Sequence, residues 1–172
     1  MGRVLSMTNK LWSMRERLEI RDENDVIVYV LESRHSWFAP AKWMIFRGDE
    51  EVGTFRHKLF SWVPTWHVSG ALGEFKFKQK VFSSKHHIYV EDGPLPGAVV
   101  TGNFWGTQFS VTDGDRALAR AQAHVMTIRN KVSIEILGEP ELFVVFAMFI
   151  VQLIRFEKKS SSSTTSGTGR YT

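Results

Sequence analysis

The amino-acid sequence predicts a mainly β protein: a closed antiparallel barrel of about twelve strands around a central, hydrophobic C-terminal α-helix. Three observations lead to this prediction. Short runs alternate apolar and polar residues with period two, marker residues recur every 21 to 25 residues, and one apolar segment, 142–156, does not alternate. The aromatic content, 13% of 172 residues, also suits the pleated faces of strands.

The repeat is marked by β-branched residues within the alternating runs. They are Ile20, Ile45, Val68, Val90, Val111 and Ile134, spaced by 25, 23, 22, 21 and 23 residues. Ten residues before three of them begins a similar tetrad: Lys10–Ser13, Lys58–Ser61 and Lys80–Ser83. Each unit also contains a polar turn, so six units predict six hairpins and about twelve strands.

A repeat of this length is also compatible with a helical solenoid. Alternating runs such as Arg17–Arg21 and Phe75–Lys78 favour strands, because successive residues of a strand point to opposite faces. About twelve antiparallel strands must also avoid exposed edges, and closing the sheet into a barrel removes them. A barrel this wide needs a filled interior.

Segment 142–156 is expected to fill that interior. Thirteen of its fifteen residues are apolar, and a helix that is apolar all round is buried in protein or in lipid. Such a helix spans roughly 22 Å, against about 30 Å for the bilayer hydrocarbon core, so burial in protein is favoured. Acids precede the segment at Glu139–Glu141 and cations follow it at Lys158 and Lys159, which suits the helix dipole. A membrane tail anchor is the alternative.

The expected organisation is a single domain with two flanking pieces. We predict an N-terminal extension at 1–6, a barrel domain at 7–159 with its central helix at about 141–157, and a disordered Ser/Thr/Gly-rich tail at 160–172. The absence of cysteine excludes disulfides and thiolate chemistry. No signal-peptide-like apolar run opens the sequence, so we expect a location in the cytoplasm, with peripheral-membrane or nuclear locations as alternatives. We also expect a monomer.

Several motifs together resemble the LURP-one-related family. They are the tetrads ending in Ser, the turn at Ile20–Asp22, the triplet Gly102–Phe104 and the closing apolar segment, and their order covers roughly residues 7–156. That family shares the tubby C-terminal-like fold with tubby proteins and phospholipid scramblases. The resemblance implies an antiparallel barrel threaded by a hydrophobic C-terminal helix, with no established enzyme activity.

Positive charge is concentrated between residues 56 and 87. This segment holds six Lys or Arg against the single acid Glu74, so it nets +5 where the whole chain nets +4. Strand alternation places Lys76, Lys78 and Lys80 on one face at intervals of about 7 Å, with Phe75 and Phe77 on the other. Neighbouring cations extend this row. The candidate anion-binding residues are Arg56, Lys58, Lys76, Lys78, Lys80, Lys85, His86 and His87.

Such a row also has a simpler explanation, since lysines keep a strand soluble and discourage edge pairing. If the row binds a ligand, the resemblance to tubby domains implies phosphates of a phosphoinositide headgroup, on an anionic membrane surface. A protein partner is the alternative. Nucleic acid is not expected, because exposed aromatic residues for base stacking cannot be identified in the sequence.

The sequence shows no arrangement for catalysis or metal binding. Its six His residues lack His-x-His or His-Glu-x-x-His spacing, and the acidic turns at 22–25 and 113–115 lack the calcium loop of an EF-hand. Gly-x-Ser-x-Gly and phosphate-binding glycine loops are also missing. We therefore expect a non-enzymatic binding protein without cofactor or metal. The alternative is scramblase-like lipid transport, in which the C-terminal helix inserts into a membrane.

Overall fold

The computed structural model describes residues 2–9, 17–36, 39–58, 61–80, 86–102, 108–125 and 130–163. These residues form twelve strands and one helix. The elements are β1 (Arg3–Asn9), β2 (Arg17–Arg21), β3 (Ile27–Ser36), β4 (Ala39–Arg47), β5 (Glu50–His57), β6 (Thr65–Gly70), β7 (Gly73–Lys80), β8 (His86–Asp92), β9 (Val99–Gly102), β10 (Gln108–Asp113), β11 (Arg116–Val125), β12 (Asn130–Ile136) and α1 (Glu141–Ser163).

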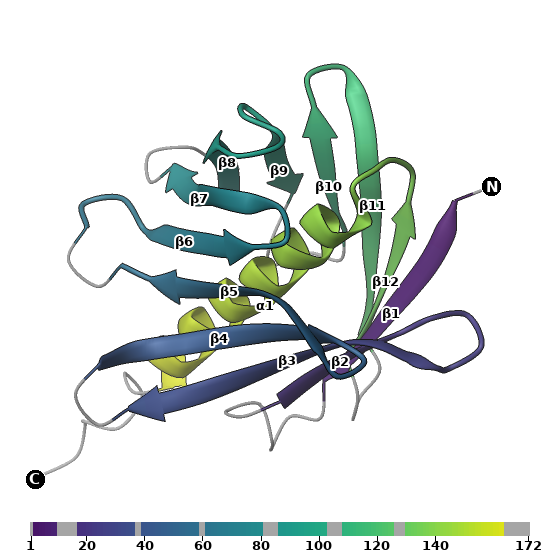
Figure 1. Ribbon diagram of the computed structural model, residues 1–172, viewed down its shortest axis with the longest axis horizontal. Coiled ribbons are helices and arrows are strands. Elements are labelled where there is room, and N and C mark those ends of the chain that lie inside the picture. The colour runs from purple at the N-terminus through teal and green to yellow at the C-terminus, as the bar shows by residue number, and fades with distance from the viewer. Residues whose placement is uncertain are drawn as a thin grey trace, which may run out of the picture.

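The strands form one closed barrel, and α1 runs through it (Figure 1). Each strand pairs antiparallel with its neighbours in the chain, and β12 pairs with β1 to close the ring. Closure provides every strand with two partners, which removes the sheet edges that invite aggregation. The predicted fold class is confirmed.

The six β-branched markers of the sequence repeat occupy equivalent places in this barrel. They fall on the six even-numbered strands, and each is at most 3% exposed. Their side chains belong to the single core cluster that also contains α1. The tetrads that precede them fall mainly outside the described residues, apart from Lys58, Ser61 and Lys80.

Helix α1 supplies the centre of the core. Residues 142–151 are all buried, and Phe143, Phe146 and Phe149 are among the largest fully buried side chains. Burial on every side explains why this segment has no polar face. In the described part of the chain, no helix combines the length and apolarity that a bilayer span requires. Insertion of α1 into lipid would first have to remove these side chains from the barrel core.

Gly53 of β5 marks a close approach between the wall and α1. A Cβ atom at this position would lie 2.4 Å from Cζ of Phe146, so glycine is what leaves room for the ring. The Phe146 ring also packs edge-on against Phe55 and Phe75, with centroid separations of 6.3 and 5.8 Å. Together these contacts restrict how α1 can rotate against β5 and β7.

Four polar residues attach the first turn of α1 to the wall, and we call them the helix latch: Arg3, Tyr29, Arg47 and Glu141. Glu141 accepts hydrogen bonds from the Tyr29 hydroxyl at 2.8 Å and from Arg3 at 2.9 Å. Arg47 donates to the Tyr29 hydroxyl, and its guanidinium carbon lies 4.9 Å from the ring centroid. Burial raises the pKa of Tyr29 to about 12, with Arg47 opposing this rise and Glu141 adding to it. The hydroxyl therefore stays protonated and bridges the two charges.

Two predicted boundaries differ from the structure. The sequence predicts an extension at 1–6, whereas β1 begins at Arg3, because Leu5 and Met7 continue the inward alternation and are fully buried. The helix begins near the predicted residue but continues to Ser163, since serine is tolerated in helices and no Gly or Pro occurs before Gly167. The rest of the predicted tail, 164–172, lies outside the described residues.

Gly53→Ala should lower the free energy of unfolding by about 1 to 3 kcal/mol, because the added methyl overlaps the Phe146 ring. Phe146→Leu removes the outer ring atoms, so it should cost less in the Gly53→Ala protein than in the wild type. Urea unfolding of the wild type, both single variants and the double variant measures this coupling. Effects that add to within about 0.5 kcal/mol would show that the two positions do not meet.

Tyr29→Phe should lower the free energy of unfolding by about 1.5 to 3 kcal/mol at neutral pH, because the hydroxyl bridges two charged groups. The wild type should also lose stability as the pH rises from about 10 to about 12, since the unfolded tyrosine releases its proton before the folded one does. The Phe variant lacks this titration and should decline less. Tyr89→Phe, at an exposed tyrosine, is the matched control and should follow the wild type in alkaline urea titrations.

Candidate functional site

The outer face of β7 carries the lysines on which the sequence prediction centred. Phe75 and Phe77 point into the core and are buried, whereas Lys76 and Lys78 are partly exposed and Lys80 is exposed. The predicted alternation is therefore present, and the lysines lie on the outside of the barrel wall.

A row of basic residues crosses four strands on this outer face. The strand register places Lys42 of β4 opposite Arg56 of β5, Arg56 opposite His67 of β6, and His67 opposite Lys76 of β7. Neighbouring strands lie about 4.8 Å apart, so the row is about 14 Å long. We call Lys42, Arg56, His67 and Lys76 the basic row.

The basic row borders a groove of about 400 Å³. The other lining residues are Thr54, Val68, Ser69, Glu74, Phe75 and Asp92. The hydroxyls of Thr54 and Ser69 share a hydrogen bond of 3.1 Å, and either oxygen can be the donor. The groove therefore offers cations along β4 and β5, hydroxyl groups in the middle, and both charge signs at β7 and β8.

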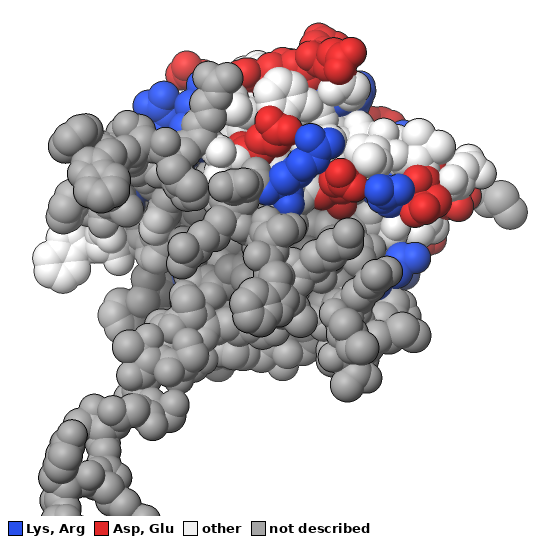
Figure 2. Space-filling view, turned by 90° about the horizontal axis from the view of Figure 1, so that it is seen from below, with Lys and Arg blue, Asp and Glu red and all other residues white. Residues whose placement is uncertain are grey.

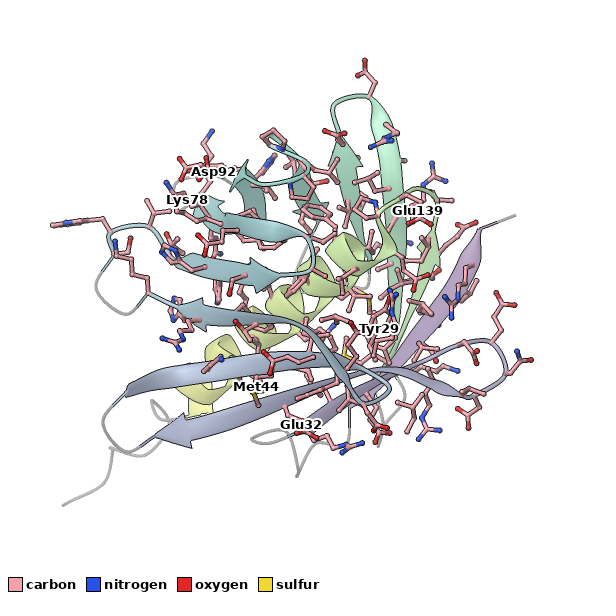
Figure 3. The ribbon with its side chains drawn as sticks, in the orientation of Figure 1. Tyr29, Glu32, Met44, Lys78, Asp92 and Glu139 are labelled. Atoms are coloured by element: carbon pink, nitrogen blue, oxygen red, sulfur yellow. The ribbon has the colours of Figure 1, made fainter. Side chains whose placement is uncertain are left out.

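Two carboxylates of β8 neutralise the β7 side of this face. Lys76 lies 3.2 Å from Asp92 and 3.7 Å from Glu91, and Lys78 lies 2.6 Å from Glu91. Figure 3 labels Lys78 and Asp92 on the neighbouring strands. The mutual hydrogen bond raises the pKa of Lys78 and lowers the pKa of Glu91. Glu91 loses its charge only below the usual glutamate range and Lys78 only above the usual lysine range, so the pair is intact at neutral pH.

Lys42 and Arg56 are not neutralised in this way. No described carboxylate forms an ion pair with either side chain. The underside of the barrel differs, because blue and red side chains alternate there in Figure 2 and Arg17 pairs with both Glu19 and Glu32. Lys42 and Arg56 are therefore the cations of the groove that are available to an anion.

Core packing holds the basic row in place. Arg56 directly follows the buried Phe55, and Lys76 lies between the buried Phe75 and Phe77. On the inner side, Phe75 and Phe77 pack on Phe143 of α1, with ring centroids 5.9 and 5.6 Å away. A binding surface on packed strands keeps its geometry better than one on loops, so the row is a preorganised array of donors.

The structure brings together part of the predicted set. Arg56 and Lys76 line the groove, and Lys78 lies next to Lys76 along β7. Lys58 and Lys80 are exposed at the ends of β5 and β7, two residues beyond Arg56 and Lys78. They lie on the same side of the barrel but do not line the groove.

The remaining predicted residues contribute less. His87 is half-buried on β8, opposite Lys80. Lys85 and the side chain of His86 lie outside the described residues. Sequence reasoning missed Lys42 and His67. Each is a polar residue next to a tryptophan in an alternating run, which is the signal that could have found them.

The structure also contains a cavity of about 540 Å³ at the end of the barrel where β4 and β12 end and β1 and β3 begin, bordered by the helix latch and Glu139. The latch residues bond to one another, and Glu139 accepts a hydrogen bond from the backbone N–H of Glu141 at 2.9 Å. We therefore assign this cavity to helix attachment. Within the described ranges, no three His, Asp or Glu side chains lie close enough to hold a metal ion.

Comparison with known proteins identifies the family. A family model described as LURP-one-related matches residues 3–154. No curated protein and no solved structure gives a match. The matched range starts at the first residue of β1 and ends within α1, so it covers all the strands of the barrel and the buried part of the helix. The chain belongs to the LURP-one-related family.

Proposed function

We propose that this protein is a non-enzymatic binding protein whose groove holds the phosphates of an anionic ligand, with a phosphoinositide headgroup as the ligand class. The observation that carries the proposal is the basic row, in which each of four basic residues on β4 to β7 lies opposite the basic residue of the next strand. Arginine binds phosphate oxygens through two parallel N–H donors, and lysine adds a point charge. Lys42 and Arg56 would therefore hold one phosphate between them.

The rest of the groove favours a phosphorylated polyol over a bare phosphate ion. Thr54 and Ser69 can donate to or accept from ring hydroxyl groups, and the carboxylate of Glu74 can accept from them. A volume of about 400 Å³ is at the lower end for small-ligand pockets, which suits one compact headgroup. An extended acidic peptide would use little of this shape.

Lipid transport by insertion of α1 lacks comparable support. The apolar side chains that would face lipid are packed against the barrel wall. The binding proposal leaves α1 in place and needs only the outer surface. Among the predicted locations, the binding proposal favours a peripheral one, at a membrane that exposes anionic headgroups.

Lys42→Ala/Arg56→Ala should weaken binding of soluble inositol trisphosphate at least tenfold, because each charge-assisted hydrogen bond is worth about 1.5 to 3 kcal/mol. Titration calorimetry measures this loss. Arg17→Ala/Arg116→Ala removes the same net charge from exposed arginines outside the groove, so it is the matched control and should bind like the wild type. Equal losses of affinity in both double variants would mean that binding depends on net charge and not on the groove, which would contradict the proposal. A wild type that does not bind inositol trisphosphate would also contradict it.

Glu91→Gln/Asp92→Asn should strengthen the same binding severalfold, because Lys76 and Lys78 lose their carboxylate partners and can turn to the ligand. Asn is chosen at 92 because Asp92 has a positive φ of 66°, a conformation that asparagine tolerates. The gain should shrink at high salt, since exposed charges are screened. Unchanged affinity at low salt would show that these lysines do not reach the ligand.

A further inference from the structure

The two ends of the barrel differ in charge. The connections that follow the even-numbered strands share one end, because neighbouring strands are antiparallel around the closed ring. They are residues 22–26, 48–49, 71–72, 93–98, 114–115 and 137–140, and they contain no Lys, Arg or His. Their acidic residues are Asp22, Glu23, Asp25, Asp49, Asp115 and Glu139. We call this the acidic end.

The opposite end carries an exposed tryptophan among cations. The described part of the connection between β5 and β6, residues 58 and 61–64, contains Lys58 and Trp62 and no acid. Trp62 is 101% exposed, so its whole indole is in contact with solvent. Lys80, also exposed, ends β7 at the same end of the barrel. We call Lys58, Trp62 and Lys80 the tryptophan end.

Backbone hydrogen bonds hold this connection against the barrel. The Lys58 N–H donates to the Thr65 carbonyl at 2.8 Å, and the Gln79 N–H donates to the Pro64 carbonyl at 3.0 Å. Trp62 therefore projects from a connection whose two sides are attached to β6 and β7. Leaving so large an apolar side chain in water forgoes the free energy of burying it, which points to a surface that covers it on contact.

A lipid bilayer fits this surface better than a protein does. A single projecting indole needs a matching pocket on a protein, whereas any bilayer interface accepts it, and tryptophan concentrates at that interface. Lys58 and Lys80 favour a leaflet that contains anionic lipids. The acidic end would be repelled from the same leaflet, so the charges of the barrel also favour one orientation.

The tryptophan end and the groove can reach the same leaflet. Arg56 precedes Lys58 by two residues and His67 follows Thr65 by two, which is about 7 Å along each strand. The headgroup layer outside the hydrocarbon core is about 5 to 7 Å thick on each side. A headgroup that projects from the leaflet would therefore meet the groove at Arg56 and His67, on the side nearest the tryptophan end, while Trp62 lies in the interface.

We infer that the tryptophan end is a docking surface for an anionic bilayer, with Trp62 in the interface, and that the groove takes its phosphates from lipids of that bilayer. This inference rests on the proposed function, because it names the source of the phosphate that the groove binds.

Sedimentation with vesicles tests the inference, using phosphatidylcholine alone and phosphatidylcholine with phosphatidylinositol bisphosphate. The wild type should sediment with the second kind, and Trp62→Ala should weaken its partitioning about tenfold, as expected for removing one inserted aromatic side chain. Tyr89→Ala removes another exposed aromatic ring, on β8, and should sediment like the wild type. Trp62→Ala should keep the wild-type affinity for soluble inositol trisphosphate.

A second measurement follows the indole directly. Vesicles with brominated acyl chains should quench part of the tryptophan emission of the wild type and less of that of Trp62→Phe. The docking inference is overturned if Trp62→Ala sediments like the wild type, or if the wild type binds soluble trisphosphate but neither vesicle, which would assign the groove to a soluble ligand. If the wild type does not bind soluble inositol trisphosphate, the proposed function is overturned instead.

Discussion

Burial of α1 in the barrel lumen is the constraint on which the other features of this protein depend. A barrel of about twelve strands is too wide for its own inward side chains to fill, so wall and helix need each other to complete a core. Phe143 and Phe146 provide the contacts, and Gly53 shows how little space separates helix from wall. At the first turn, Arg3 and Tyr29 of the helix latch bond to the carboxylate of Glu141, which directly precedes the apolar segment.

The same packing sets the outer surface, because each strand presents its two faces in alternation. Phe55 and Phe75 face α1, so Arg56 and Lys76 must face solvent on the opposite side of the wall. The groove thus lies on the outer face of the same strands whose inner face carries the aromatic residues that pack on α1. A substitution in the core beneath β5 and β7 would therefore change the affinity of the groove for a ligand, because it would shift the strands that carry Arg56 and Lys76.

Charge is distributed around this rigid frame in an uneven way. Glu91 and Asp92 offset the lysines of β7, and the acidic end carries no cation in its connections. Within the described ranges, Lys42 and Arg56 of the groove and Lys58 and Lys80 of the tryptophan end form no ion pair with a carboxylate, as is also true of the exposed Arg120 and Lys131 on β11 and β12. The cations of the groove and of the tryptophan end lie together on β4 to β7 and the connection after β5, which gives this part of the barrel a direction in which to meet an anionic surface.

The sequence by itself determined the barrel, the strand faces and the central helix, because period-two alternation and an uninterrupted apolar segment are local properties of the chain. It also placed Lys76 and Lys78 on the outside. Only the tertiary structure decided which cations meet. An unbroken ladder from the pair Arg47–Glu50 would set Lys42 opposite Phe55, and the bulge between Ile45 and Phe46 moves it opposite Arg56. The register is set by pairing between strands, which also brings Glu91 close to Lys78. The periodicity of residues within a single strand carries no information about that pairing.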